Sequence, residues 1–139
     1  MADANAYKKT LPRLDEESRG YWEALKRHEL YLQRCRSCGE LRFYPRALCP
    51  ACLADDTEWV RASGRGTVYS FTVTYQNQAP GFREELPYVL AIVELAEGVR
   101  CTTNIVGCPA EQVRIGLPVE VVFDDVTPEV TLAKFRPHA

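Results

Sequence analysis

The amino-acid sequence predicts a mainly β protein with an N-terminal helix, a small metal-binding ribbon and a C-terminal barrel of five strands. Three observations lead to this prediction. Two Cys-x-x-Cys pairs at 35–38 and 49–52 are separated by ten residues, an apolar helical pattern precedes them, and short strand patterns alternate with turns after residue 63. The 139 residues suit one ordinary domain or two small ones. We expect a tail and helix in 1–29, the ribbon in 30–60 and the barrel in 61–139.

The helix is expected to begin at Asp15 and to end near His28, after a loose tail at residues 1–10. Asp15 suits the N-cap, acidic residues follow it, and basic residues occupy the last turn. The apolar residues at helical spacing are Leu14, Tyr21, Trp22 and Leu25. This stripe either packs on the chain's own core or docks on a partner, and the sequence leaves both alternatives open. As a docking helix it would present Tyr21, Trp22 and Leu25.

A tetrahedral metal site is predicted at the two cysteine pairs, which consist of Cys35, Cys38, Cys49 and Cys52. Four thiolates at this spacing can converge on one ion, and four protein ligands leave no open coordination position. We therefore expect structural Zn²⁺, with a single iron as the alternative because four thiolates also suit iron. Strand-like segments at 30–34 and 41–45 indicate a hairpin around the first pair. A ribbon this small would depend on its metal for most of its stability.

The C-terminal half contains five predicted strands, at 67–75, 88–95, 99–106, 119–123 and 130–135. One face of the first is expected to carry Tyr69, Phe71, Val73 and Tyr75, and one face of the third to carry Val99, Cys101, Thr103 and Ile105. A short helical turn is predicted at 109–113. A long first strand, with a helical turn between the third and fourth strands, matches the OB-fold. An SH3-like barrel is the alternative.

Composition and charge narrow the range of functions. The formal net charge of −2 disfavours a general polyanion binder, although residues 34–46 hold four arginines against one acid. No apolar run approaches the roughly 20 residues that span a bilayer, and the N-terminus lacks an apolar signal core. We therefore expect a cytoplasmic protein without a membrane partner, where reducing conditions favour metal over disulfides. With two histidines and no Gly-rich phosphate loop, the sequence predicts no catalytic residues.

Two other segments are candidate binding surfaces. The ribbon residues Arg42, Phe43, Tyr44 and Arg46 could hold a phosphorylated nucleotide by bidentate hydrogen bonds and stacking, or could form a solvated face. The long connection between the first two barrel strands carries Ala79, Pro80, Gly81 and Phe82 at its tip. Long loops of this kind are often functional, and the alternative is an ordinary loop whose phenylalanine packs back on the barrel.

The order of several motifs resembles a known family. The motifs are Tyr21-Trp22-Glu23-Ala24-Leu25, Leu32-Gln33-Arg34-Cys35-x-x-Cys38-Gly39, Tyr44-Pro45-Arg46-x-x-Cys49-Pro50-x-Cys52, Gly66-Thr67-Val68-Tyr69-Ser70-Phe71-Thr72-Val73, Pro87-Tyr88-Val89, Glu94-Leu95-x-Glu97-Gly98-Val99-Arg100 and Ile115-Gly116-Leu117-Pro118-Val119. Together they resemble the small proteins that pair a rubredoxin-like zinc ribbon with an OB-fold and accompany thiolase-like enzymes. The resemblance covers about residues 10 to 136.

The resemblance implies a non-catalytic accessory subunit of a thiolase-fold enzyme that acts on acyl-CoA. Such partners include thiolases, acyl transferases and retro-aldol lyases in lipid or steroid degradation, in a hetero-oligomer that we expect to be a heterotetramer. It implies that the four cysteines bind zinc, that the ribbon helps hold the CoA end of a thioester, and that barrel loops shape the partner's acyl channel. No motif match assigns the CoA contacts, which are inferred from residue chemistry. A nucleic-acid-binding module and a rubredoxin-like electron carrier are the alternatives.

Overall fold

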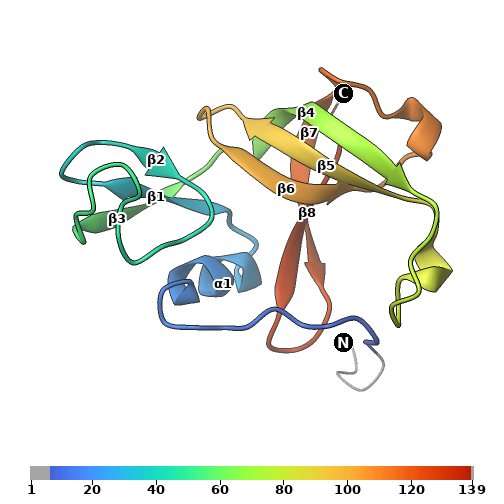
Figure 1. Cartoon of the computed structure of the whole chain (residues 1–139), viewed down its shortest axis with the longest axis horizontal. Helices are drawn as coiled ribbons and strands as arrows, with labels where there is room; N and C mark the ends of the chain where they lie inside the picture. The colour runs from blue at the N-terminus through green and yellow to red at the C-terminus, as the bar shows by residue number, and fades with distance from the viewer. Residues whose placement is uncertain (1–6, 139) are drawn as a thin grey trace.

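The computed structural model describes residues 7–138, which form one helix, a three-stranded sheet and a closed five-stranded barrel (Figure 1). The first six residues of the expected tail and the last residue of the expected barrel domain lie outside the described residues. The predicted mainly β class, with a helix, a ribbon and a five-stranded barrel, is confirmed. None of the helices in 7–138 is long and apolar enough to cross a membrane.

Helix α1 (Arg19–Lys26) begins four residues later than predicted. The Asp15 carboxylate accepts hydrogen bonds from the backbone N–H of Ser18 at 3.0 Å and from its hydroxyl, which fixes a turn before the helix instead of capping it. The prediction that Leu14 belongs to the helical stripe is wrong, because Leu14 precedes the helix and is 48% exposed. Tyr21 and Leu25 do point inward, and they pack in the core of the chain itself.

The ribbon is an antiparallel sheet in the order β2-β1-β3, formed by β1 (Tyr31–Cys35), β2 (Leu41–Arg42) and β3 (Thr57–Arg61). The sequence predicted the first two strands but not β3, which lies where the composition changes and where the module boundary was expected. The predicted extension of the second strand to residue 45 is wrong. Pro45 has no N–H for a ladder, and the next backbone N–H, of Arg46, donates to the Gln33 side chain at 2.7 Å.

The barrel closes in the order β4-β5-β6-β8-β7. Its strands are β4 (Arg65–Thr74), β5 (Tyr88–Leu95), β6 (Arg100–Ile105), β7 (Pro118–Asp125) and β8 (Thr131–Pro137). Each predicted strand is confirmed to within two residues, and the predicted helical turn is a 3₁₀ turn at Ala110–Gln112. Neighbouring strands run antiparallel except for β6 and β8, which are parallel and share the single pair Ile105↔Phe135.

A β-bulge changes the face of the long strand β4. The register shifts between Val68 and Ser70, so Val68 is buried while Tyr69 is 46% exposed. The single apolar face predicted for this strand is therefore wrong at Tyr69. It is also wrong at Tyr75, which follows the last residue of β4 and is 69% exposed. An extra residue in one strand redirects the side chains on one side of it, which a period-two pattern cannot foresee.

Helix, ribbon and barrel share one hydrophobic core. Its buried members include Leu25 of α1, Leu32 of β1 and Phe135 of β8. Next to this core, the exposed ring of His28 stacks on Phe123 at a centroid distance of 5.1 Å. Figure 1 shows α1 between the ribbon and the β7–β8 hairpin. The predicted boundary between residues 60 and 61 falls inside β3, so the division into modules stays a prediction.

The contact between His28, two residues after α1, and Asp125 at the end of β7 should depend on pH. Hydrogen bonds from the Thr131 hydroxyl and from His28 Nε2, which lies 3.0 Å away, lower the pKa of Asp125. A lowered pKa stabilises the fold above the unfolded-state value of about 3.9 and stops doing so as the pH falls through the folded-state value. Asp125→Asn should therefore cost up to about 1 kcal/mol at pH 7, a small amount because the pair is exposed.

Urea unfolding at pH 7, 5 and 3 measures this difference between wild type and Asp125→Asn. We expect the difference between the two curves to shrink toward pH 3, as the aspartate becomes protonated. Asp55→Asn, at another exposed carboxylate, is the matched control and should show no such convergence. An equal cost of Asp125→Asn at pH 3 and pH 7 would contradict the assignment.

Candidate functional site

The four cysteine sulfurs form one compact cluster. They lie within 4.8 Å of one another, with 3.6 Å between the sulfurs of Cys35 and Cys52 and 3.7 Å between those of Cys38 and Cys49. Sulfurs bound at about 2.3 Å around a tetrahedral zinc are about 3.8 Å apart. The donor set therefore has the size that one tetrahedral ion requires.

Two turns of the same construction bring the sulfurs together. The backbone carbonyl of Cys35 accepts from Gly39 N, and that of Cys49 accepts from Leu53 N, both at 2.8 Å. The fourth residue after each first cysteine has a positive φ, 78° at Gly39 and 66° at Leu53. Glycine adopts this conformation freely, whereas leucine rarely does, so the sequence signalled the first turn more clearly than the second.

Backbone N–H groups favour thiolates within the cluster. The N–H of Cys38 lowers the pKa of Cys35, and the N–H of Cys52 lowers the pKa of Cys49 to about 7. The N–H of Glu40 also lowers the pKa of Cys38, but burial and hydrogen sharing with Cys49 raise it to about 12. Four adjacent thiolates need a cation to balance their charge, so this donor set fits a structural Zn²⁺.

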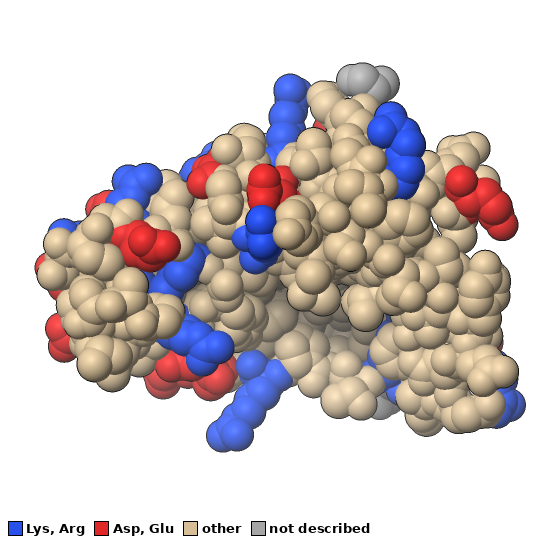
Figure 2. Space-filling view, turned by 45° about the horizontal axis from the view of Figure 1, so that its top comes forward, with Lys and Arg blue, Asp and Glu red and all other residues tan. Residues whose placement is uncertain are grey.

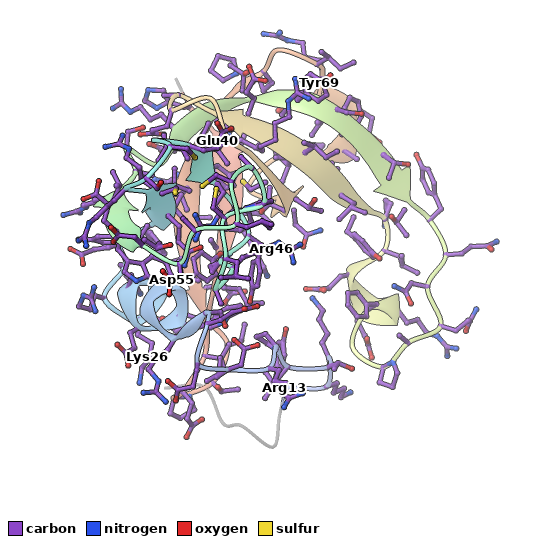
Figure 3. The ribbon with its side chains drawn as sticks, turned by 60° about the vertical axis from the view of Figure 1, so that its left-hand side comes forward. Arg13, Lys26, Glu40, Arg46, Asp55 and Tyr69 are labelled. Carbon is purple, nitrogen blue, oxygen red and sulfur yellow. The ribbon has the colours of Figure 1, made fainter. Side chains whose placement is uncertain are left out.

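The four ribbon residues predicted to bind CoA fall into two groups. Arg42 is only 6% exposed, and its Nη2 donates to the Arg46 carbonyl at 2.9 Å and to Thr57 Oγ1 at 2.7 Å. Arg46 is exposed on the loop between β2 and β3 (Figure 3). Phe43 and Tyr44 lie beside Tyr21, with ring centroids 5.4 and 5.8 Å from it. Arg42 thus belongs to the ribbon interior, while Tyr44 and Arg46 are accessible.

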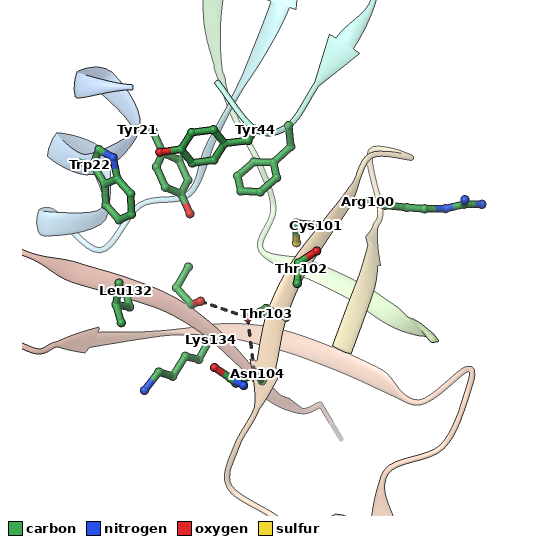
Figure 4. Close-up of a pocket in the computed structure, with 12 residues that line it drawn as sticks. Tyr21, Trp22, Tyr44, Arg100, Cys101, Thr102, Thr103, Asn104, Leu132 and Lys134 are labelled. Atoms are coloured by element: carbon green, nitrogen blue, oxygen red, sulfur yellow. Dashed lines mark hydrogen bonds between the residues drawn. The ribbon is translucent and has the colours of Figure 1, made fainter. Parts of the chain in front are cut away.

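A cavity of about 490 Å³ lies between the helix, the ribbon and the barrel (Figure 4). Its lining consists of the aromatic residues Tyr21, Trp22, Phe43 and Tyr44 on one side, and residues 100–104 of β6 with residues 132–134 of β8 on the other. Side chains predicted for two separate roles, helix docking and CoA binding, therefore meet at one place. The face shown in Figure 2 is hollowed between the ribbon and the barrel, and mostly uncharged residues surround the hollow.

Among the three residues predicted to dock a partner, Tyr21 and Leu25 are buried in the core and only Trp22 is partly exposed. The barrel side of the cavity was missed by the sequence analysis. Its residues come from strands about 30 positions apart, and no local pattern indicates that they meet.

The N-terminal segment contacts the loop at 79–82, which was predicted to be functional. Lys9 Nζ lies 4.9 Å from the centre of the Phe82 ring and forms an ion pair with Glu85, and Lys8 lies 3.8 Å from Glu84. A Cβ on Gly81, whose φ is +86°, would come within 2.9 Å of the backbone nitrogen of Lys9. The prediction of a loose tail is therefore wrong at these two lysines. The loop tip at Ala79 and Pro80 remains exposed.

Phe82 itself packs back toward the barrel, with its ring 5.8 Å from that of Tyr88. A second cavity of about 340 Å³ lies beneath it and also contacts Cys108 of the barrel. Phe82 therefore packs back on the barrel, as the alternative interpretation of the loop expects, and a functional role of the loop stays a prediction.

Comparison with known proteins agrees with this architecture. Residues 22–58 match the family model "ChsH2, rubredoxin-like zinc ribbon domain", and residues 59–124 match "ChsH2, C-terminal OB-fold domain". A solved structure described as an "Ltp2-ChsH2(DUF35) aldolase" is 41% identical, with a TM-score of 0.83, and the match covers 91% of this chain and 98% of that one. The chain belongs to the ChsH2/DUF35 family. The resemblance and the OB-fold predicted from the sequence are thereby confirmed.

Other members of the ChsH2/DUF35 family carry varied names. A "DUF35 domain-containing scaffold protein" of Methanocaldococcus jannaschii is 43% identical over 105 residues, 73% of each chain. A "Probable enoyl-CoA hydratase alpha subunit" of Thermomonospora curvata is 41% identical over 126 residues, 91% of this chain. The chain spans only 39% of the length of that hydratase subunit. "Benzoylsuccinyl-CoA thiolase subunit BbsA" of Thauera aromatica is 36% identical over 76 residues, 55% of this chain and 51% of that protein.

Proposed function

We propose that this chain is a non-catalytic accessory subunit that docks on a thiolase-fold enzyme and helps to position its acyl-CoA substrate. The observation that carries the proposal is the likeness, at 41% identity, to a chain of an Ltp2-ChsH2(DUF35) aldolase. The names of the other relatives, a scaffold protein, a thiolase subunit and a hydratase subunit, support a subunit role with CoA thioesters. None of these names describes a nucleic-acid-binding protein or an electron carrier.

In this proposal Cys35, Cys38, Cys49 and Cys52 bind one structural Zn²⁺. When bound, the ion supplies folding free energy to the ribbon and takes no part in the reaction, because four thiolates complete its coordination. The segment 39–48 between the two cysteine pairs carries Phe43 and Tyr44, two of the four aromatic residues that line the cavity. Anchoring both ends of this segment therefore fixes Phe43 and Tyr44 against the helix.

The exposed pair Tyr44 and Arg46 suits the nucleotide end of CoA. An aromatic ring can stack on adenine, and a guanidinium can bind phosphate oxygens in a bidentate manner. Arg42 supports this surface from inside, since its Nη2 holds the Arg46 carbonyl at 2.9 Å. The partner supplies the nucleophile and base, and docking orders the loop tip, Ala79 to Phe82, beside the partner's acyl channel. Trp22 is the helix residue that remains available for contact.

Co-expression with a candidate thiolase-fold enzyme tests the proposal. We expect the two chains to co-elute in a hetero-oligomer, with a heterotetramer predicted, and we expect turnover of an acyl-CoA substrate only when both are present. The isolated chain should be inert toward the same substrate. If the enzyme alone turns over acyl-CoA at the full rate, the accessory role is wrong.

Phe82→Ala should slow this complex while leaving the metal in place. The substitution removes a ring that packs on Tyr88 and lines the second cavity, a contact whose loss costs about 1 kcal/mol or several-fold in rate. Turnover and zinc content are measured on the same preparation. Ile115→Ala, at an exposed apolar residue that lines neither cavity, is the control. Loss of zinc from the Phe82 variant would contradict the proposal that the loop acts in the complex while the zinc site acts only in folding.

A further inference from the structure

Strand β3 (Thr57–Arg61) has one unpaired side. The ribbon sheet has the order β2-β1-β3, so β3 bonds to β1 on one side and to no other strand of the described chain on the other (Figure 1). No residue of β3 is buried, and Trp59 at its centre is 37% exposed. β2 contributes only two residues to the opposite edge of the sheet, so β3 forms the long free edge of the ribbon.

The ladder with β1 shows which backbone groups of β3 face outward. Beyond the two ends of β3, Ala62 N donates to the Leu30 carbonyl at 2.8 Å, and Arg36 N donates to the Asp56 carbonyl at 2.9 Å. Because bonded residues alternate in an antiparallel ladder, the even-numbered residues of β3 bond to β1. The backbone groups that point away from β1 are those of Thr57, Trp59 and Arg61. Within residues 7–138, no hydrogen bond satisfies these three N–H groups.

This edge lacks the features that usually prevent strand pairing. Proteins protect a free edge with proline, lysine, a bulge or a covering segment. β3 contains neither proline nor lysine, and its register with β1 is unbroken over five pairs. The exposed ring of Trp59 adds a large apolar surface at the middle of the edge. Such an edge can bind another extended strand through backbone hydrogen bonds.

The charges along this edge favour a second copy of the same strand. The residues are, in order, Asp55-Asp56-Thr57-Glu58-Trp59-Val60-Arg61. Antiparallel pairing about Trp59 sets the acidic end of one copy beside the basic end of the other. Asp55, which is exposed, then lies diagonally across from Arg61 of the second copy, within reach of a long side chain (Figure 3). Arg61 pairs with Glu29 at 3.2 Å in its own chain, and its guanidinium has further N–H groups to donate.

One register suits the edge better than its neighbours. With Trp59 opposite its own copy, every outward residue of β3 faces an outward residue of the other β3, and each pair can exchange both backbone hydrogen bonds. Pairing centred on Glu58 would place two carboxylates directly opposite each other, which is destabilising. Pairing centred on Val60 would require Ser63, whose N–H already donates to the Glu97 carboxylate at 2.8 Å.

We propose that β3 is a self-association edge, through which two copies of this chain pair antiparallel about Trp59 and join their ribbons into one continuous sheet. The two Trp59 rings lie next to each other on one face of that sheet, and each Asp55 pairs with Arg61 of the other copy. Since each copy contributes a single strand, the interface is small, and we expect a dissociation constant on the order of 10 µM. This association does not depend on a thiolase-fold partner.

Sedimentation equilibrium of the zinc-loaded full chain, over a wide range of concentrations, measures the dimer. Asp55→Lys and Arg61→Glu each place like charges together, and each should weaken the dimer about tenfold because the symmetric interface contains the pair twice. The double variant restores opposite charges and should dimerise like wild type. Glu111→Lys, at an exposed acid of the barrel domain, changes the net charge as Asp55→Lys does and is the matched control.

Amide hydrogen exchange locates the contact. The N–H groups of Thr57, Trp59 and Arg61 should gain protection as the dimer forms, whereas those of Glu58 and Val60 should be protected by β1 at every concentration. The inference is overturned if the chain stays monomeric, if the double variant fails to restore the dimer, or if a dimer forms while the three edge amides stay unprotected. Protection that arises only when a thiolase-fold enzyme binds would also overturn it, by assigning the edge to that enzyme.

Discussion

Cys49→Ser is expected to abolish zinc binding and to unfold the ribbon. Cys49 is fully buried within the sulfur cluster, and the second turn has no other ligand at that position. Structural zinc contributes about 10–16 kcal/mol of binding free energy in small peptides, and this free energy is also folding free energy. The melting temperature should therefore fall by on the order of 10 °C or more. Metal analysis and thermal unfolding measure the two effects.

Cys108→Ser is the matched control, because Cys108 is half-buried and lies outside the sulfur cluster. It should keep one zinc per chain and most of the stability. The same preparations test the iron alternative, since an iron–thiolate site is red and zinc is colourless. A Cys49→Ser protein that retains one zinc per chain would show that the assignment of the ligands is wrong.

Leu25→Ala should destabilise the free chain by about 3–5 kcal/mol. Leu25 has no exposed surface, and it joins α1 to a core that also contains residues of the ribbon and the barrel. Trp22→Ala, three residues away and half-buried, should cost only about 1–2 kcal/mol but should weaken partner or ligand binding. Urea unfolding and co-elution with the partner distinguish the two.

This pair of variants separates two functions of one helix: packing in the core of the chain and contact with a partner or ligand. If Leu25→Ala left the stability unchanged and mainly weakened docking, the helix would be a partner-binding element and not a part of the core. If both variants destabilised the chain equally, Trp22 would have no separate role.

The parts of the fold that depend on local pattern were predictable from the sequence. The cysteine spacing alone identified the metal cluster, because four donors on two short turns need little else to converge. The five barrel strands were found because each alternates or carries a short apolar run between turn residues. The start of α1 was not predicted correctly, since Asp15 caps a preceding turn by bonding Ser18.

The candidate site was only half predictable. Its aromatic side lies on segments with visible motifs, whereas its barrel side depends on where β6 and β8 separate, which follows from the closure of the whole barrel. The burial of Arg42 could not be foreseen either, because Thr57, which accepts from its guanidinium, lies on the one ribbon strand that the sequence did not reveal.

The position of β3 (Thr57–Arg61) bears on how this architecture is inherited. The two family models meet at residues 58 and 59, in the middle of a strand that pairs with β1 along its whole length. A gene rearrangement at that junction would cut a sheet that encloses the metal site and would separate a helix from half of its core. We therefore expect ribbon and barrel to be inherited and recombined together, as one structural unit. The hydratase subunit of Thermomonospora curvata fits this view, because its match to the chain extends over both parts inside a longer protein.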